Sequence, residues 1–442
     1  MKVLLIFPEL EKNVQFHHLP LSLLALAAPL EKRGIHCEIY DERVDDQKEM
    51  YKMLEVADVI GITMFTGYQT TRAYEILNQI KSLNRNHIVV AGGPHVTSLP
   101  EQVLDSELVD YVVVGYGEET FCRLVEQLSG EGVKCNTEID GVGYIGQDGQ
   151  SIINKPKYCI DKEYWHSLPY HKIDINKYIN PDTKMVMYVT MYGCPGKCTF
   201  CATPCTMKCI QKPEDLVISD LMALYDRYNY RMLVLNDATF FVNKRRMISI
   251  LSSLKEYAGM QWCAFSRADE IVKYSINELR EIKSAGGELV NLAIGLESGS
   301  SYVAEEIMKK GKNHLGKFKE CIKNLVEVGI PVTSGLIFGV PGERPEDVQN
   351  TIKYISEIRN IYPDFKLSTT FFRPLPGTNL FKELDLGGFV MPKSLKAWAG
   401  YASQNHYKYN EWMDIPWMVE SDKQKYRIMY EKFVDIHGDI VV

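Results

Sequence analysis

The sequence has no long hydrophobic run. No apolar stretch approaches the ~20 residues that a transmembrane helix requires. The first apolar run, VLLIF at 3–7, is shorter than the core of a signal peptide, which needs roughly 7 residues or more. We therefore predict a chain without a membrane span and interpret this first run as a buried strand.

An excess of charge of one sign is also missing. The 50 Lys and Arg residues are interspersed with 57 Asp and Glu residues, which gives a net charge of −7. A basic surface for nucleic acid or anionic membranes is therefore not expected. The 11 cysteines are odd in number and lack periodic spacing, which argues against a secreted disulfide framework. We predict a cytoplasmic protein.

A dinucleotide-binding motif is absent as well, because FPELEKN follows the first predicted strand where G-x-G-x-x-G would stand. Strands are expected at 2–7, 36–41, 58–65, 87–93 and 110–117, and helices at 21–34, 71–83 and 118–128. Apolar strands separated by helices are typical of a parallel sheet that is covered on both faces. The α/β pattern thus predicts a Rossmann-like doubly wound parallel sheet over residues 1–130.

A second α/β domain is predicted after a hairpin and linker at 131–184. Strands are expected at 185–191, 231–237, 261–267, 289–297, 331–339 and 366–376, and helices at 213–228, 276–287, 316–329 and 344–360. Six strand–helix repeats predict a partial (β/α)6 barrel of the TIM type over 185–380. Residues 381–442 are predicted to be a small α-rich region that covers the substrate.

Polar residues follow four of the predicted barrel strands: Asp237, Arg267, Glu297 and Glu343. Barrel enzymes keep their active sites at the carboxyl ends of the strands. The sequence therefore places a candidate site at this end of the barrel.

Three cysteines lie close together in MYGCPGKCTFCATPC at 191–205. Cys194, Cys198 and Cys201 are spaced C-x3-C-x2-C, directly after the first barrel strand. Structural zinc takes four protein ligands, and Cys205 or Cys209 is available as the fourth. Three thiolates can instead hold three irons of a [4Fe–4S] cube and leave the fourth iron open to a small molecule. The spacing alone leaves both metals open.

This motif, with a strand before it and a barrel after it, resembles the radical S-adenosylmethionine (radical SAM) family. The resemblance implies that the three cysteines bind a [4Fe–4S] cluster whose open iron binds S-adenosyl-L-methionine (SAM). It also implies that SAM is cleaved to a 5′-deoxyadenosyl radical, which takes hydrogen from a small-molecule substrate. The electron would come from a reducing partner such as flavodoxin or ferredoxin.

Further segments match the family and imply contacts to SAM. These are Phe200 near the adenine, Asp237 in LNDATFF near the methionine part, Arg267 in AFSRAD at its carboxylate, Glu297 and Ser298 in IGLESGS near the ribose, and Gly339 and Val340 in GLIFGVPGE beside the adenine. Each polar residue keeps a structural alternative. Asp237 can cap a helix, and Arg267 can pair with a neighbouring acid.

The N-terminal domain resembles the cobalamin-binding domain of cobalamin-dependent radical SAM enzymes, through VIGITMFTGYQTTRAYEI, VVAGGPHVTSLPEQVL and DYVVVGYGEETF. The resemblance implies that the corrin's nucleotide tail enters near Thr63, Gly92 and Gly93, with Gly115 and Glu118 alongside. The D-x-H-x-x-G segment that supplies a histidine to cobalt in methionine-synthase-like domains is missing. A degenerate domain that binds no cobalamin is therefore an alternative, and His17, His18 and His95 are expected to be surface or hydrogen-bonded residues.

Three functions remain in competition. The first is cobalamin-dependent methylation of a carbon atom in biosynthesis. The second is a cobalamin-independent radical dehydration, epimerisation or cyclisation of a small metabolite. The third is a non-enzymatic module stabilised by zinc. Aromatic residues near the end of the chain can line a substrate pocket or form an ordinary core: Trp398, Tyr401, His406, Tyr407, Tyr409, Trp412 and Trp417.

Overall fold

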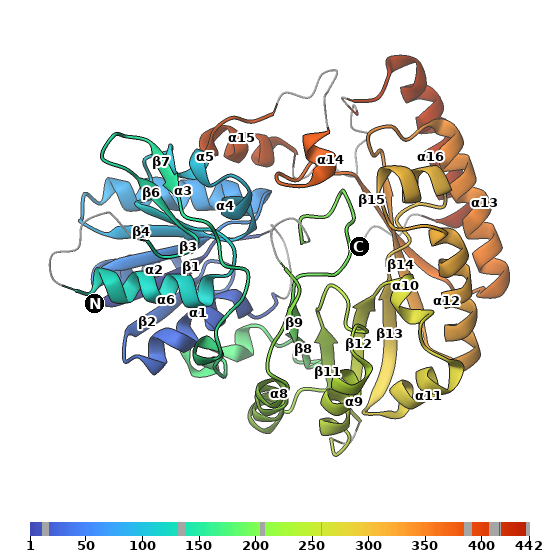
Figure 1. Cartoon of the computed structure of the whole chain (residues 1–442), viewed down its shortest axis with the longest axis horizontal. Coiled ribbons are helices and arrows are strands. Elements are labelled where there is room, and N and C mark those ends of the chain that lie inside the picture. The colour runs from blue at the N-terminus through green and yellow to red at the C-terminus, as the bar shows by residue number, and fades with distance from the viewer. Residues whose placement is uncertain are drawn as a thin grey trace. The chain divides into compact units, whose positions relative to one another are not determined.

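The computed structural model describes residues 1–10, 17–130, 138–203, 208–257, 259–383, 391–405, 415 and 417–438 (Figure 1). Its contacts divide the chain into two compact units. The front unit comprises Met1–Thr183, Thr206–Asp220 and Met391–Tyr407, and the barrel unit comprises Lys184–Cys205, Leu221–Val390 and Lys408–Val442. Cys205 and four of the C-terminal aromatics (His406, Tyr407, Tyr409 and Trp412) lie outside the described residues.

The front unit contains a seven-stranded sheet in the order β2-β1-β3-β4-β5-β6-β7. Its strands are β1 (Lys2–Phe7), β2 (His36–Asp41), β3 (Val59–Thr63), β4 (Ile88–Gly92), β5 (Tyr111–Val113), β6 (Val142–Ile145) and β7 (Ser151–Ile153). β1 to β5 are parallel, and β6 and β7 are antiparallel. The hairpin expected in the linker therefore extends the sheet, because β6 pairs with β5, the last of the parallel strands.

Helices cover both faces of this sheet, which confirms the doubly wound prediction. The helices are α1 (Leu21–Lys32), α2 (Gln47–Leu54), α3 (Tyr68–Ser82), α4 (Pro94–Ser98), α5 (Pro100–Leu104) and α6 (Gly117–Leu128). α2 to α5 share one apolar core with the strands, and α1 and α6 pack together on the other face (Figure 1). Gly61 in β3 is needed there, because a Cβ atom would lie 2.7 Å from Leu5 Cδ2.

The barrel unit contains six parallel strands in the order β15-β14-β13-β12-β11-β8. They are β8 (Met185–Tyr188), β11 (Met232–Leu235), β12 (Gln261–Ser266), β13 (Glu288–Ile294), β14 (Val332–Phe338) and β15 (Lys366–Phe371). The longer helices along the chain are α8 (Glu214–Tyr228), α9 (Lys244–Ser253), α11 (Ile276–Ser284), α12 (His314–Val328) and α13 (Pro345–Ile361). The order confirms the partial (β/α)6 barrel.

Shorter elements complete the described chain. They are η1 (Lys162–Tyr164), η2 (Tyr170–Lys172), η3 (Ile175–Lys177), β9 (Met191–Tyr192), β10 (Ile210–Gln211), α10 (Ala268–Ile271), the π-helix η4 (Tyr302–Ile307) and α14 (Asn379–Lys382). β14 shows how the barrel is layered, because Val332, Ser334, Leu336 and Phe338 are buried and the residues between them are half-buried. This period of two fits one face under helices and one facing the barrel interior.

The two C-terminal helices belong to different units. α15 (Leu395–Asn405) packs on α3 in the front unit, and α16 (Glu420–His437) packs on α13 in the barrel unit. Trp398 of α15 is only 1% exposed, and its Nε1 donates to Gln102 Oε1 at 3.1 Å. Trp398 is therefore part of an ordinary aromatic core, although it falls in the region at 381–442 that is predicted to cover the substrate.

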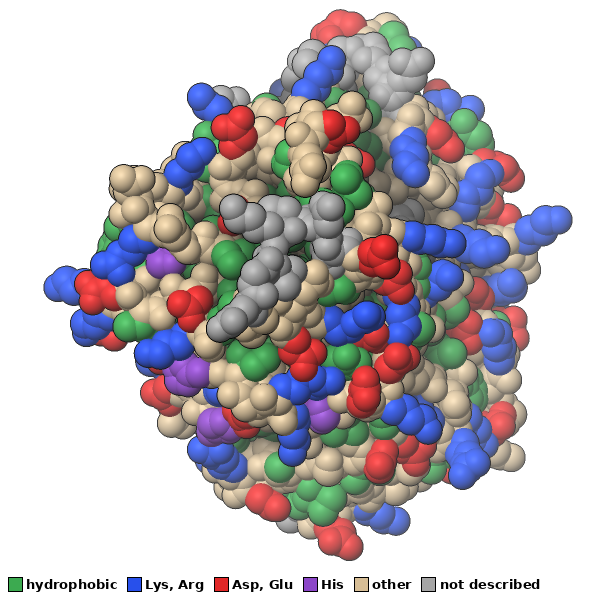
Figure 2. Space-filling view, turned by 60° about the vertical axis from the view of Figure 1, so that its left-hand side comes forward, with side chains coloured by type: hydrophobic (Ala, Val, Ile, Leu, Met, Phe, Trp, Pro, Cys, Tyr) green, Lys and Arg blue, Asp and Glu red, His purple; other side chains and the backbone are tan. Residues whose placement is uncertain are grey.

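Lys and Arg side chains are intermingled with Asp and Glu side chains over the face in Figure 2. In the part of the chain that the structure describes, no helix combines the length and apolar character needed to cross a membrane.

Candidate iron–sulfur and nucleotide site

The cysteine loop follows β9 at the carboxyl end of β8. Gly193 has φ +72°, a left-handed conformation that favours glycine and turns the chain out of the strand. Cys194 Sγ accepts a hydrogen bond from Gly196 N at 3.3 Å, and Cys201 N donates to Cys198 O at 3.3 Å. Cys198 is buried, whereas Cys194 and Cys201 are partly exposed.

The three thiols are close enough to influence one another. Burial raises the pKa of the Cys201 thiol, and the neighbouring Cys198 and Cys194 raise it further because like charges are disfavoured there. In the described ranges, no three His, Cys, Asp or Glu side chains converge on one metal-ion position. Three thiols on one loop match the three cysteine ligands of a [4Fe–4S] cluster that leaves one iron open.

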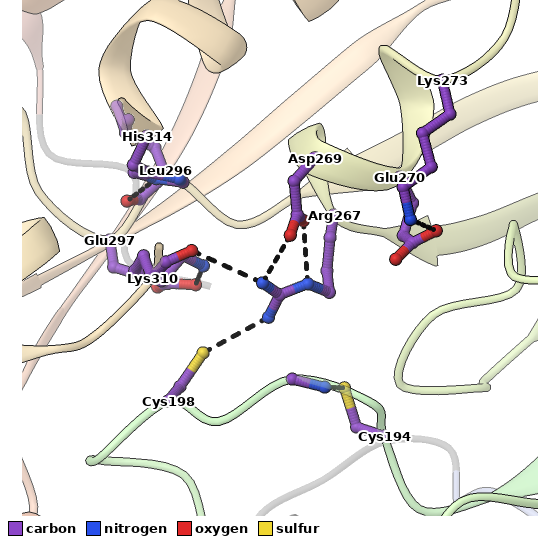
Figure 3. A network of polar contacts seen from close by, with 11 residues as sticks. Cys194, Cys198, Arg267, Asp269, Glu270, Lys273, Leu296, Glu297, Lys310 and His314 are labelled. Atoms are coloured by element: carbon purple, nitrogen blue, oxygen red, sulfur yellow. Dashed lines mark hydrogen bonds and ion pairs between the residues drawn. The ribbon is translucent and has the colours of Figure 1, made fainter. Parts of the chain in front are cut away.

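Arg267 stands beside these thiols, directly after β12 (Figure 3). Its Nη1 lies 3.4 Å from Cys198 Sγ, and its Nε and Nη2 bind both oxygens of Asp269 at 2.9 and 3.0 Å. Burial lowers the pKa of Arg267, but Asp269 and Cys198 outweigh it and raise this pKa, so the guanidinium stays charged. Gly196 leaves room for it, because a Cβ atom there would lie 2.3 Å from Arg267 Nη1.

Glu297 and Lys310 form an ion pair near Arg267. Lys310 Nζ lies 3.2 Å from Glu297 Oε1, and their side chains are 6% and 16% exposed. Glu297 has φ +68°, which is strained for a residue with a Cβ atom. Its backbone bonds to Gly335 and Ile337 of β14 hold it in this conformation. The strain at a strand end fits a functional residue.

Asp237 is 1% exposed, and the chain itself occupies its oxygens. Thr190 N, Thr190 Oγ1 and Met191 N all donate to the carboxylate, and Arg246 donates to Thr190 O at 3.0 Å. Burial raises the pKa of Asp237, and these hydrogen bonds oppose that shift. Asp237 therefore fixes the turn that leads into the cysteine loop, and a contact to SAM stays a prediction.

Ser298 and Gly339 are also engaged within the chain. Ser298 is buried, and its Oγ accepts from Ser300 N at 3.1 Å. Gly339 has φ +72°. Its N–H donates to Glu343 Oε2 at 2.6 Å, and its C=O accepts from Trp417 Nε1 at 2.8 Å. These bonds place both residues at the ends of β13 and β14, while their predicted contacts to SAM remain untested.

Phe200 and Val340 are the other residues predicted near the adenine. Phe200 is half-buried in the cysteine loop, whereas Val340 is 1% exposed after β14. The exposed part of Phe200 is free to pack on a ligand, and a contact through Val340 would involve its backbone.

The residues predicted near cobalamin lie at the carboxyl ends of β3, β4 and β5. Thr63 is buried, and a Cβ atom on Gly93 would lie 2.9 Å from its Oγ1. Gly93 and Gly115 have φ +104° and +88°, and Gly115 N donates to Thr97 Oγ1 at 3.1 Å. Glu118 is buried in the first turn of α6. The glycines let the backbone pack closely at these strand ends, and the predicted contacts of all five residues to cobalamin remain untested.

Three histidines of the front unit, His17, His18 and His95, differ in burial. His95 is buried, its Nδ1 lies 3.0 Å from Thr66 Oγ1, and burial lowers its pKa to about 4. His17 is half-buried and His18 is exposed. The prediction of a hydrogen-bonded His95 is confirmed.

Comparison with known proteins matches two segments of the chain. Residues 11–125 match the B12 binding domain, and residues 188–355 match the radical SAM superfamily. The chain therefore contains a B12 binding domain and a radical SAM domain. The radical SAM domain implies a [4Fe–4S] cluster and SAM, and the B12 binding domain adds cobalamin as a candidate cofactor. The hypothesis of a non-enzymatic zinc module is therefore wrong.

Curated relatives of this radical SAM enzyme match most of its length. An uncharacterized methyltransferase of Pyrococcus horikoshii is 29% identical over 396 residues, which cover 86% of this chain and 83% of the relative. Cytidylyl-2-hydroxyethylphosphonate methyltransferase of Streptomyces wedmorensis is 25% identical over 440 residues, which cover 85% and 79%.

Two solved structures share the fold of this radical SAM enzyme. TsrM from Kitasatospora setae, a radical SAM methyltransferase with cobalamin and a [4Fe–4S] cluster bound, aligns with TM-score 0.66 and 18% identity over 87% of this chain and 78% of TsrM. OxsB with aqua-cobalamin and SAM bound aligns with TM-score 0.71 and 17% identity over 98% of this chain and 66% of OxsB.

Lys310 and Thr199 were missed by the sequence analysis. Lys310 lies in MKKGKN, where nothing distinguishes it from Lys309 and Lys312. Thr199 lies inside the cysteine motif, but threonine has no metal-binding role that would draw attention to it. The structure shows that both are buried beside the site.

Proposed function

We propose that this enzyme methylates a carbon atom of a small-molecule substrate in a biosynthetic reaction that uses both SAM and cobalamin. When bound, the cluster supplies an electron to SAM, and cobalamin supplies a methyl group. The observation that carries the proposal is the presence of both modules on one chain: a B12 binding match over 11–125 and a cysteine loop beside the half-buried Arg267 and the buried Lys310 at the barrel's carboxyl end. The names of the relatives support methylation.

The chain's own residues are assigned as follows. Cys194, Cys198 and Cys201 hold the cluster. Arg267 and Lys310 present positive charge for the carboxylate of SAM, because guanidinium and ammonium groups bind carboxylates strongly when water is excluded. Phe200 offers an exposed aromatic surface to the adenine. Both cations are already oriented, Arg267 by Asp269 and Lys310 by Glu297, so binding needs little reorganisation.

The polar residues at the ends of β11, β13 and β14 support this arrangement. Asp237 holds the turn before the cysteine loop, and Ser298 and Gly339 fix the strand ends. In the front unit, Thr63, Gly92, Gly93, Gly115 and Glu118 form the proposed entry for cobalamin. The electron donor is proposed to be flavodoxin or ferredoxin.

The test is an analysis of products. The anaerobically reconstituted enzyme is reduced and incubated with methyl-deuterated SAM, cobalamin and a metabolite extract from its source cells. Methylation predicts both S-adenosylhomocysteine and 5′-deoxyadenosine, together with a metabolite that carries the labelled methyl group. A cobalamin-independent rearrangement predicts 5′-deoxyadenosine alone. A Cys198→Ala variant is the matched control and should form neither product.

A further inference from the structure

Thr199 occupies the centre of the cysteine motif, between Cys198 and Phe200. It is 6% exposed, and all three of its polar groups bind segments that are distant in the sequence. Its N–H donates to Met308 O at 3.1 Å, its Oγ1 donates to Ile307 O at 2.6 Å, and its C=O accepts from Leu380 N at 2.8 Å.

These hydrogen bonds pair backbone groups at the ends of two helices. Ile307 and Met308 lie at the carboxyl end of the π-helix η4, where the last carbonyls have no partner inside the helix. Leu380 lies in the first turn of α14, where N–H groups are also left without helical partners. The cysteine loop therefore acts as a cap for both helices. π-Helices are uncommon and frequently occur at functional sites.

The same contacts close a ring around the site. Lys310 lies two residues after Met308, and its C=O accepts a hydrogen bond from Arg267 Nη2 at 3.5 Å. Arg267 Nη1 in turn lies 3.4 Å from Cys198 Sγ (Figure 3). Cys198 is bonded covalently to Thr199. A displacement of Thr199 would therefore move the thiolate and the two cations relative to one another.

We propose that Thr199 is a positioning residue that fixes the distance between the Cys198 thiolate and the cations Arg267 and Lys310. The proposal rests on the cluster and SAM assignment of the proposed function and adds a determinant of how the two are aligned. If the hydrogen bonds of Thr199 are weakened, we expect Cys198 to hold its iron less firmly. We also expect the two cations to lose their alignment with the open iron. Both iron retention and SAM affinity should then change.

The test compares Thr199→Val, Thr199→Ser and Thr71→Val in the full-length, anaerobically reconstituted protein. Thr71 is the matched control, because it is 7% exposed and its Oγ1 donates to the C=O of Ala399 at 2.8 Å in the front unit. One readout is the rate of iron transfer to excess bathophenanthroline disulfonate. The other is the SAM concentration that gives half of the change in the EPR spectrum of the reduced cluster.

We expect Thr199→Val to release iron about 5-fold faster and to need about 5-fold more SAM, the size expected for the loss of one net hydrogen bond. Thr199→Ser keeps the hydroxyl and should stay within about 2-fold of the wild type. Thr71→Val should match the wild type in both readouts. Thr199→Ala, which removes the hydroxyl without placing a methyl group against the Ile307 carbonyl, gives the same comparison if Thr199→Val does not fold.

Two results would overturn the proposal. Wild-type values for both readouts in Thr199→Val would show that the loop does not depend on this residue. Faster iron release with unchanged SAM affinity would show that Thr199 is only a tether for the loop. A wild-type protein that takes up no iron would instead refute the proposed function, so the two failures are distinguishable.

Discussion

Arg267 Nη1 lies 3.4 Å from Cys198 Sγ, while the other edge of the same guanidinium forms a two-point contact with Asp269. The carboxylate fixes the plane of the guanidinium and leaves Nη1 directed toward the cysteine loop. A permanently charged group thus stands at the thiol that is buried most deeply among the three. This position suits a cation that meets an anionic ligand next to a cluster.

Replacing Arg267 with Lys should weaken SAM binding. Lysine keeps the charge but cannot bind Asp269 and a carboxylate at two points each. We expect the dissociation constant for SAM, measured by EPR titration of the reduced cluster, to rise about 10-fold, as befits the loss of one charged hydrogen bond. An Asp269→Asn variant keeps Arg267 but weakens its orientation, and should show a smaller rise. Equal SAM affinity in all three proteins would contradict this role for Arg267.

Replacing Lys310 with Met should destabilise the protein. Glu297 would keep its charge in a largely buried position without a partner, which costs about 2 kcal/mol of unfolding free energy after allowance for its partial exposure. The matched control is Lys309→Met, because Lys309 is 53% exposed and pairs with Glu306 on the surface. That pair should contribute less than about 1 kcal/mol. Urea unfolding measures the unfolding free energy of both variants. An equal loss in Lys310→Met and Lys309→Met would show that the buried ion pair contributes no more stability than the surface pair.

Glu343 should make stability depend on pH. Burial raises its pKa to about 7, although hydrogen bonds from Tyr426 and Gly339 oppose the shift. Among the described residues its Oε1 has no hydrogen-bond partner, which leaves a carboxylate there poorly compensated. Because the folded pKa lies above the unfolded value near 4.5, the folded protein retains a proton that the unfolded chain loses. The contribution of Glu343 to the unfolding free energy is fully present below pH ~4.5. It is lost as the pH rises toward and through ~7.

The comparison is between wild type and Glu343→Gln, with unfolding free energy measured at several values between pH 5 and 8. The wild type should lose up to about 3 kcal/mol relative to the variant as pH rises, because one pKa unit corresponds to about 1.4 kcal/mol. Parallel curves for the two proteins would mean that Glu343 titrates normally.

Trp398 should anchor α15 to the front unit. Its indole is buried, bonds to Gln102, and meets the His95 ring edge-on at 5.7 Å. We expect Trp398→Ala to cost about 3 kcal/mol and to increase hydrogen exchange in α3 and α15. Trp398→Phe should cost only about 1 kcal/mol, because it loses the hydrogen bond but keeps an aromatic ring. Unchanged exchange in Trp398→Ala would exclude the anchoring role.

The strands and the cysteine loop could be predicted because their signals are local. KVLLIF coincides with β1, since buried parallel strands are continuous apolar runs. HCEIYD coincides with β2. The motif spacing singled out Cys194, Cys198 and Cys201 in the same way. The hairpin at β6 and β7 was also visible, but its pairing with β5 was not, because pairing depends on residues that are distant in the sequence.

The partners of individual polar residues could not be predicted. The roles of Thr199 and Lys310 depend on contacts across 108 residues to Ile307 and across 13 residues to Glu297, and no local pattern reports such contacts. Asp237 is expected near SAM, and its carboxylate also holds the turn at Thr190. The sequence showed the acidic residue at a strand end but not its backbone partners.

The most direct test of the central claim is EPR spectroscopy of the anaerobically reconstituted, reduced protein with and without SAM. The account predicts about four irons per chain, a reduced cluster signal that shifts when SAM is added, and loss of the iron when Cys194, Cys198 and Cys201 are replaced with Ala. A protein without iron, or a cluster signal that SAM leaves unchanged, would contradict it.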